Sequence, residues 1–260
     1  MKTYQEHLAT ALLAGAVLSV FASASAALAE RPALPGIGAQ DRRIVVDAAL
    51  APWRSLVKVQ TNLGGRCTGV LVDPRRVVTA AHCLYNGRTR RYLPVSSLHV
   101  LFGYARGEYS GHVTVSAFTV PPDYDPTRPL EGLAGDWAVL DLAKAAPAGV
   151  PPLPLATEMP PVGSALALGG YSQDKAQIVT ADIDCRLLGG AQVPGGELLL
   201  HDCAGTRGTS GAALLAEQNG NWEVVGIAVA AGTQEERHNL AVPSSAFASA
   251  LRAGPGAEQP

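Results

Sequence analysis

Three polar residues, each next to an apolar or glycine-rich segment, could together catalyse acyl transfer. Ser210 lies between Gly208 and Gly211, and these glycines allow a backbone bend that leaves the serine hydroxyl unobstructed. His82 and Asp136 each adjoin an apolar segment long enough for a β-strand. A serine hydroxyl becomes a nucleophile when a neighbouring base accepts its proton, and histidine is the side chain most often used as that base. These residue types predict a serine nucleophile, a histidine base and an acid that orients the histidine.

The histidine lies at the end of a predicted β-hairpin. The segment from Cys67 to Cys83 has the pattern of a strand, a tight turn and a second strand, and a disulfide between the two cysteines would close it. Closing a loop of this length contributes roughly 3 kcal/mol in the loop-entropy description. It would also fix the backbone that aims His82, as a general base requires. The alternative is a surface histidine beside a structural disulfide.

The predicted orienting acid begins an apolar strand. A half-buried carboxylate costs desolvation free energy unless it is paired, and the N–H of an imidazole is a suitable partner for Asp136. This pairing would fix the tautomer whose other nitrogen is free to accept a proton. Asp141, Asp123 and Asp125 are competing acids, but the first lies further along the strand and the others in a proline-rich loop. Asp136 is favoured, and an ordinary aspartate at a strand edge is the alternative.

The glycines around Ser210 would also supply hydrogen-bond donors. A bend here turns backbone N–H groups toward a common point, so the N–H groups of Gly208 and Ser210 would form an oxyanion hole. Taken alone, the Gly-x-Ser-Gly pattern is common. Its spacing differs from the Gly-x-Ser-x-Gly elbow of α/β-hydrolases, and the chain lacks the strand-helix alternation of that fold. Esterase activity is therefore expected at most as a side activity.

Short β-branched segments separated by glycine and proline predict an all-β protein. The 260 residues include 28 glycines and 19 prolines, and 47% of them are hydrophobic, which is enough for a large core built from many short elements. Strands are predicted at Leu56–Gln60, Thr68–Val72, Val77–Thr79, Leu98–Phe102, His112–Phe118, Trp137–Leu142, Ala165–Leu168, Leu198–Leu200 and Val224–Val229. One helix is predicted within Pro243–Arg252, and the proline-rich segment Ala146–Pro161 is predicted to link two halves of similar length.

The N-terminus and the net charge restrict where the protein works and what it binds. Lys2, the apolar segment Leu8–Phe21 and the small residues Ala27 and Ala29 are typical of an export signal that is cleaved before Glu30. The apolar segment is shorter than the about 20 residues of a membrane-spanning helix. The formal net charge of −2 provides no general attraction to nucleic acid. We therefore expect a secreted or periplasmic protein with no stable membrane anchor and no nucleic-acid partner.

Four cysteines in an exported chain predict two disulfides. Three pairings are allowed. If Cys67 pairs with Cys83 in the hairpin, Cys185 pairs with Cys203 by elimination and would brace the loop that leads to Ser210. No C-x-x-C pair is present, and the histidine and cysteine spacings match no zinc template. No metal or other cofactor is expected.

These motifs together resemble those of the chymotrypsin-like serine proteases. The resemblance rests on Thr79-Ala80-Ala81-His82-Cys83 preceded by Cys67-Thr68-Gly69, on the Asp136 strand, and on Gly208-Thr209-Ser210-Gly211, in the family's order of His, Asp and Ser. It covers residues 44–252 and implies two six-stranded antiparallel β-barrels with the active site in the cleft between them. It also implies an endopeptidase that cleaves proteins or peptides through an acyl-enzyme on Ser210. We expect a monomer.

The expected organisation has four parts. Residues 1–29 form the signal peptide, 30–43 a short propeptide or linker, 44–148 the N-terminal barrel, and 149–260 the C-terminal barrel with a short terminal helix. The segment beginning Arg43-Ile44 resembles the activation site of the trypsin branch, so cleavage after Arg43 is a hypothesis. In that branch an aspartate precedes the nucleophile and pairs with the new N-terminal amine, but this position is Thr209. The threonine makes the chain more similar to the bacterial glutamyl-endopeptidase-like branch.

Three alanines are the candidate substrate-binding residues: Ala204, Ala228 and Ala230. None is acidic, so the trypsin device for binding Lys or Arg is absent at these positions. Ala228 lies near the position where glutamyl endopeptidases have a histidine. A charged substrate side chain would remain unpaired there, so we expect a preference for small or apolar residues. The alternative function is a catalytically inactive binding module with the protease fold.

Overall fold

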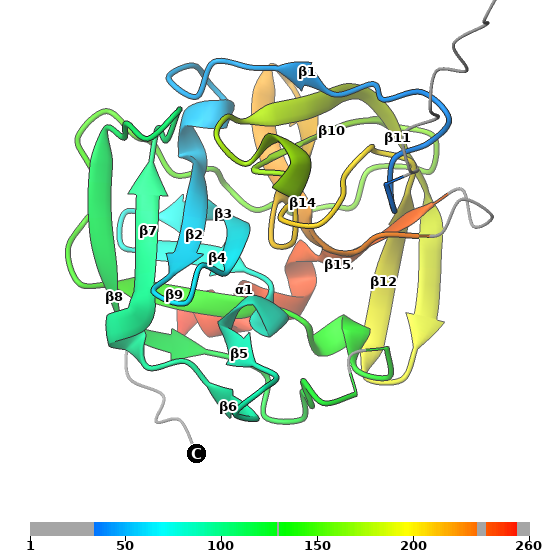
Figure 1. Ribbon diagram of the computed structural model, residues 1–260. Helices are drawn as coiled ribbons and strands as arrows, with labels where there is room; N and C mark the ends of the chain where they lie inside the picture. Colours follow the sequence, from blue (N-terminus) through cyan, green and yellow to red (C-terminus); the bar gives the residue numbers. More distant parts are fainter. Residues whose placement is uncertain (1–33, 129, 233–237, 254–260) are drawn as a thin grey trace, which may run out of the picture. The chain divides into compact units, whose positions relative to one another are not determined.

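Two closed antiparallel β-barrels of six strands each make up most of the computed structural model (Figure 1). The structure describes residues 34–128, 130–232 and 238–253, so the predicted signal peptide lies outside the described residues. The first barrel has the order β2-β3-β4-β9-β8-β7, formed by β2 (Leu56–Thr61), β3 (Arg66–Asp73), β4 (Arg76–Thr79), β7 (Leu98–Phe102), β8 (Gly111–Thr119) and β9 (Ala138–Leu142).

The second barrel has the order β11-β10-β13-β14-β15-β12 and closes because β12 also pairs with β11. Its strands are β10 (Ala165–Gly170), β11 (Thr180–Val193), β12 (Gly196–His201), β13 (Ala213–Gln218), β14 (Asn221–Ala230) and β15 (Asn239–Pro243). The short strand β1 (Ile44–Val45), at the start of the predicted N-terminal half, pairs with β11 of this barrel. The predicted domain boundaries stay a prediction.

The smaller elements occupy the connections between strands. They are the two-stranded sheet of β5 (Tyr85–Asn86) and β6 (Arg91–Tyr92), and the 3-10 turns η1 (Trp53–Ser55), η2 (Ala81–Leu84), η3 (Val95–Ser97), η4 (Leu133–Gly135) and η5 (Gln173–Lys175). The helix α1 (Ser244–Arg252) follows β15 and buries Phe247 against Trp137. Within the described residues, no helix has the length and apolarity needed to cross a membrane.

The predicted all-β class, the two barrels and the C-terminal helix are confirmed. Each predicted strand overlaps an observed one. The strand pattern is clearest in β8, where Val113 and Val115 are buried while His112, Thr114 and Ser116 are exposed. The prediction missed β11, β13 and β15, together with the two-residue strands.

Apolar side chains fill both barrel interiors and also the interface between the barrels. Val59, Leu71 and Leu140 are among those inside the first barrel, and Leu168 and Val225 are among those inside the second. A third cluster combines residues of both barrels, with Leu56, Val70, Val78, Leu215, Ile227 and Phe247 among its buried members. Burial of this shared cluster holds the barrels together, which matters because the candidate site draws on both.

Candidate active site

The pairing of β4 with β9 brings His82 and Asp136 together. The two strands are antiparallel, and their register places Thr79, the last residue of β4, opposite Ala138, the first residue of β9. His82 follows three residues after Thr79, and Asp136 precedes Ala138 by two residues. Because the end of one antiparallel strand meets the beginning of the other, both side chains emerge at the same end of the first barrel.

Two hydrogen bonds join the carboxylate of Asp136 to His82. The backbone N–H of His82 donates to Oδ1 at 2.9 Å, and its ring Nδ1 lies 2.6 Å from Oδ2. The side chain of Asp136 is 2% exposed whereas that of His82 is 35% exposed, so the acid is buried behind a histidine that remains accessible. An ionised carboxylate accepts the Nδ1 proton, and this leaves Nε2 without a proton and able to accept one.

The environment of His82 raises its pKa above the ordinary value of 6.5. Burial by itself lowers the pKa, since it disfavours the charged imidazolium. The hydrogen bond to Asp136 and the negative charge of that carboxylate more than offset the effect of burial. The pair is therefore arranged to stabilise a proton on the imidazole, as a general base needs when it accepts one.

Two tyrosines also lie close enough to Asp136 to respond to its charge. Burial and the negative charge of Asp136 raise the pKa of Tyr92 to about 12, and they raise the pKa of Tyr124 as well. The two phenols therefore stay protonated at neutral pH. Neither phenol therefore adds a negative charge beside Asp136.

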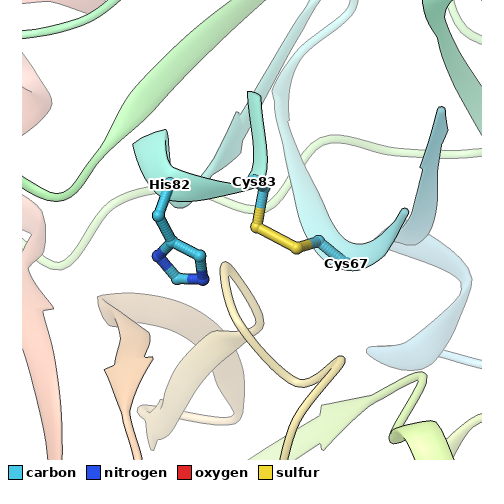
Figure 2. Close-up of side chains that lie close together, drawn as sticks. All are labelled: Cys67, His82 and Cys83. Atoms are coloured by element: carbon cyan, nitrogen blue, oxygen red, sulfur yellow. A yellow bond between two sulfur atoms is a disulfide. The ribbon is translucent and has the colours of Figure 1, made fainter. Parts of the chain in front are cut away.

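The disulfide between Cys67 and Cys83 holds the turn that carries His82 (Figure 2). The S–S distance is 2.02 Å, and Figure 2 shows His82 and Cys83 side by side on one short turn, with Cys67 on a separate segment. The His82 ring and the two sulfurs offer ligand atoms within 4.8 Å of one another. Both sulfurs are consumed by the disulfide, however, so neither is a thiolate that could bind a metal. The disulfide instead fixes the backbone next to His82 and so limits the positions of the imidazole.

The Ser210 loop belongs to the second barrel but is bonded to the first through Thr68. This threonine, fully buried on β3, donates its backbone N–H to Ser210 O at 2.9 Å and its Oγ1–H to Gly208 O at 2.9 Å. Its own carbonyl oxygen accepts a hydrogen bond of 2.8 Å from Thr79 Oγ1, three residues before His82. Thr68 is part of the sequence motif, but the sequence indicates no role for it, because hydrogen bonds between barrels leave no local signal.

Gly211 allows the Ser210 loop to pack closely against Thr68 and Thr79 of the first barrel. Its φ of +79° favours glycine. A Cβ atom there would lie within 3.0 Å of Thr79 Oγ1, Thr68 O and Ala80 N. Any side chain would push the Ser210 loop away from the segment leading to His82. The glycine after the serine is therefore needed to bring the two barrels into contact at the site.

The backbone of the loop leaves its predicted oxyanion donors free. The N–H groups of Thr209, Gly211 and Ala212 donate to carbonyl oxygens within the protein. Across the described parts of the chain, the N–H groups of Gly208 and Ser210 have no such acceptor. The pattern fits the expected donor pair, and its role remains a prediction.

The hydroxyl of Ser210 is free in the same way. In the described ranges no hydrogen bond joins its Oγ to Nε2 of His82 or to any other group. Hydrogen bonds between a nucleophile and its base are often long before substrate binds and shorten in the reacting complex. The structure thus brings the His82 and Ser210 segments together without closing that contact.

A pocket of about 280 Å³ opens beside Ser210. Of the predicted substrate-binding residues, Ala228 and Ala230 line it, whereas Ala204 does not. The rest of the lining is Pro35, Leu168, His201, Gly205, Thr206, Arg207, Thr209, Val229, Ala231 and Asn239. Burial lowers the pKa of His201 to about 4, so this lining residue is neutral at neutral pH. No described lining residue is acidic.

The second disulfide joins Cys185 on β11 to Cys203, which begins the loop leading to Ser210. The predicted pairing is therefore the one present. The loop is further held by Asn239, whose Nδ2 donates to Cys203 O at 2.7 Å. Thr209 stands where the trypsin branch has an aspartate. Its Oγ1 forms a buried hydrogen bond of 3.0 Å with Ser172 Oγ.

The fold and the site together define a double β-barrel protein of the serine-protease type, with its candidate nucleophile on one barrel and its candidate base on the other. Comparison with known families assigns the chain within this class. The family described as trypsin matches residues 45–251, and the chain belongs to that family.

Individual relatives are similar over limited lengths. A trypsin of Phaedon cochleariae is 30% identical over 182 residues, which cover 65% of each chain. A glutamyl endopeptidase of Bacillus licheniformis is 38% identical over 50 residues, covering 19% of this chain and 16% of that protein. The chain therefore spans less than two thirds of the length of these relatives.

Two solved structures show the same fold. A Glu endopeptidase in complex with MPD superimposes with a TM-score of 0.68 at 22% identity, covering 83% of this chain and 97% of the other. The Vibrio cholerae VesB protease superimposes with a TM-score of 0.62 at 18% identity, covering 80% and 65%. Similarity to a glutamyl endopeptidase agrees with the branch expected from Thr209.

Proposed function

We propose that the protein is a secreted serine endopeptidase in which Ser210, His82 and Asp136 form a catalytic triad. The observation that carries the proposal is the buried carboxylate of Asp136, which accepts hydrogen bonds from both the backbone and the ring of His82. A carboxylate that binds Nδ1 of an accessible imidazole holds the ring in place and leaves its Nε2 free to act as a base.

The mechanism follows from this geometry. His82 Nε2 accepts the hydroxyl proton as Ser210 Oγ attacks the peptide carbonyl carbon, and the carbonyl electron pair moves onto oxygen. The free N–H groups of Gly208 and Ser210 stabilise that oxyanion, while Asp136 stabilises the imidazolium. The imidazolium then protonates the leaving amine as the C–N bond breaks. Water, activated by the same histidine, hydrolyses the acyl-enzyme and restores the serine.

A fluorophosphonate probe tests the nucleophile directly. We expect the native protein to gain one covalent adduct on the peptide that contains Ser210, detected by mass spectrometry. Heat-unfolded protein is the control and should gain none, because the reaction needs the assembled base and oxyanion donors. A folded, processed protein that hydrolyses no peptide and takes up no probe would instead be the inactive binding module.

The pH dependence should report the raised pKa of His82. The base works only when neutral, so kcat/KM should be low at acid pH and rise through an apparent pKa above 6.5. Initial rates on a peptide substrate across pH 5–9 would measure this rise of kcat/KM with pH. A rise centred well below 6.5 would show that the group controlling activity is not His82 beside a charged Asp136.

Substrate preference follows from the pocket beside Ser210. Ala228 and Ala230 occupy little space, and the described lining offers no carboxylate to pair with Lys or Arg. We propose a preference for small or apolar side chains at P1, the residue before the cleaved bond. A peptide-library digest tests this, and selective cleavage after Glu or Arg would contradict it.

The site of action is outside the cytosol. Two disulfides are typical of exported proteins, and the predicted signal peptide agrees with export to the periplasm or the medium. We propose that the protein works as a monomer on protein or peptide substrates. Size-exclusion chromatography with light scattering would test the oligomeric state.

A further inference from the structure

We propose that residues 34–43, here called the N-terminal strap, are a permanent wall of the substrate pocket. The active enzyme would retain them, and cleavage after Arg43 would inactivate rather than activate it. The inference rests on the proposed protease function. It differs from the hypothesis drawn from the Arg43-Ile44 motif, in which release of this segment would create the active form.

Gly36 attaches the strap to both sides of the pocket. Its N–H donates to Gly232 O at 3.1 Å, and its carbonyl oxygen accepts from Gly205 N and from Asn239 Nδ2, each at 3.0 Å. Gly205 lies on the loop that leads to Ser210, and Gly232 follows β14. Gly36 has a φ of +76°, and a Cβ there would lie within 3.0 Å of Gly205 O. The strap backbone is thus hydrogen-bonded both to the loop before Ser210 and to the segment after β14.

The strap borders the pocket without filling it. Pro35 lines the same pocket as Ser210 and Ala228, and the volume of about 280 Å³ is open with the strap in place. Ile37, two residues further on, is buried and anchors the strap to the protein. A propeptide that blocked the site would occupy this volume, whereas a wall leaves it open.

An ion pair between the half-exposed Arg42 and a buried carboxylate ties the strap to β11, and through β11 to the loop before Ser210. Arg42 reaches Asp182 Oδ2 with Nη2 at 2.9 Å and Nε at 3.1 Å, and the Asp182 side chain has no exposed surface. The same Oδ2 accepts the backbone N–H of Ala204 at 2.8 Å. Loss of the strap would leave this carboxylate buried without its cation, which is strongly unfavourable.

The bond after Arg43 is poorly presented to a processing protease. The Arg43 side chain is 1% exposed and is held by Asp41 and Asp174, each at 2.8 Å. A protease that cleaves after arginine must take that side chain into its own pocket, so both ion pairs would first have to break. The next residue, Ile44, pairs with β11 and is exposed. Cleavage at this bond would therefore require the strap and β1 to come loose from the folded unit first.

A pair of glycine substitutions tests whether the strap forms a wall of the substrate pocket. Gly36→Ala would displace the strap, and we expect kcat/KM to fall by about 10²-fold, as misplacement by about 1 Å can cause. Gly38→Ala is the matched control, since Gly38 is exposed, a Cβ there meets nothing within 4 Å, and activity should stay within about twofold. Equal activities, or a gain in Gly36→Ala, would overturn the proposal.

Pro35→Ala separates a pocket wall from a merely structural role. Removing ring atoms from the lining should raise kcat/KM for a peptide with Phe at P1 relative to one with Ala, by about tenfold, which is the size of discrimination that small changes in a pocket produce. A strap that only supports the fold would change both substrates equally. An unchanged ratio would therefore contradict the pocket role.

The N-terminal sequence of the probe-labelled protein tests whether the active enzyme retains the strap. We expect fluorophosphonate-labelled, secreted protein to yield an intact peptide across Arg43-Ile44, and labelled molecules that begin at Ile44 would overturn the inference. Absence of all labelling would defeat the proposed protease function, and the strap would then be judged by stability. Gly36→Ala should lower Tm by about 5 °C relative to Gly38→Ala, and equal Tm values would remove the strap from the fold.

Discussion

Replacing Ser210 by alanine is expected to lower kcat for peptide hydrolysis by about 10⁶-fold, the effect typical of removing a serine nucleophile. Ser210 Oγ has no hydrogen-bond partner in the described chain, so its loss leaves no buried group unpaired. The loop conformation depends instead on Gly211 and on the hydrogen bonds from Thr68. Tm should therefore hardly change while activity disappears.

The measurement is hydrolysis of a peptide substrate by purified protein, with Ser245→Ala as control. Ser245 is exposed on α1, and its replacement should leave the rate unchanged. Substantial activity in Ser210→Ala would assign the nucleophile to another residue and refute the triad.

Asp136→Asn should lower kcat/KM by about 10⁴-fold while Ser210 stays in place. The amide oxygen can still accept the backbone N–H of His82, but the amide NH₂ would then face Nδ1. That contact favours the tautomer with the proton on Nε2, which cannot accept the serine proton. The acid and its amide have nearly the same shape, so the loss would arise from the proton arrangement rather than from packing.

Asp141→Asn is the matched control, because Asp141 lies on β9, the strand that follows Asp136, and is one of the competing acids in the sequence. Its carboxylate binds Arg76 Nε at 3.1 Å, away from the histidine. We expect a far smaller loss of activity than in Asp136→Asn, since this carboxylate is bonded to Arg76 and not to the histidine. The reverse ranking of the two variants would move the orienting acid to Asp141.

The residues proposed for catalysis could be predicted from the sequence because each lies in a local motif. Asp136 rested on the shortest of these motifs, and it was the structure that paired it with His82. Thr68 and Gly36 could not be assigned a role, since their contacts join segments more than a hundred residues apart in the chain. Only the closed barrels reveal these contacts.

The barrels also contain strands that could not be recognised as strands from their sequences. β11 combines charged residues with Gly189-Gly190, and its burial does not alternate regularly along its length. β13 begins with the continuous apolar segment from Ala213 to Ala216, in which alternation cannot be seen because both faces are buried. Pairing with neighbouring strands decides the structure in both cases.

The hydrogen bonds of Thr68 have a consequence for how the protein could be divided. His82 and Asp136 lie on the first barrel and Ser210 on the second, so either barrel made separately would carry an incomplete set of chemical groups. Thr68 and Gly211, together with the apolar cluster shared by the barrels, are contacts through which the two pieces would have to recognise one another. Reassembly of two separately made fragments could then be followed by the return of activity, with catalysis serving as a reporter that the halves have docked in register.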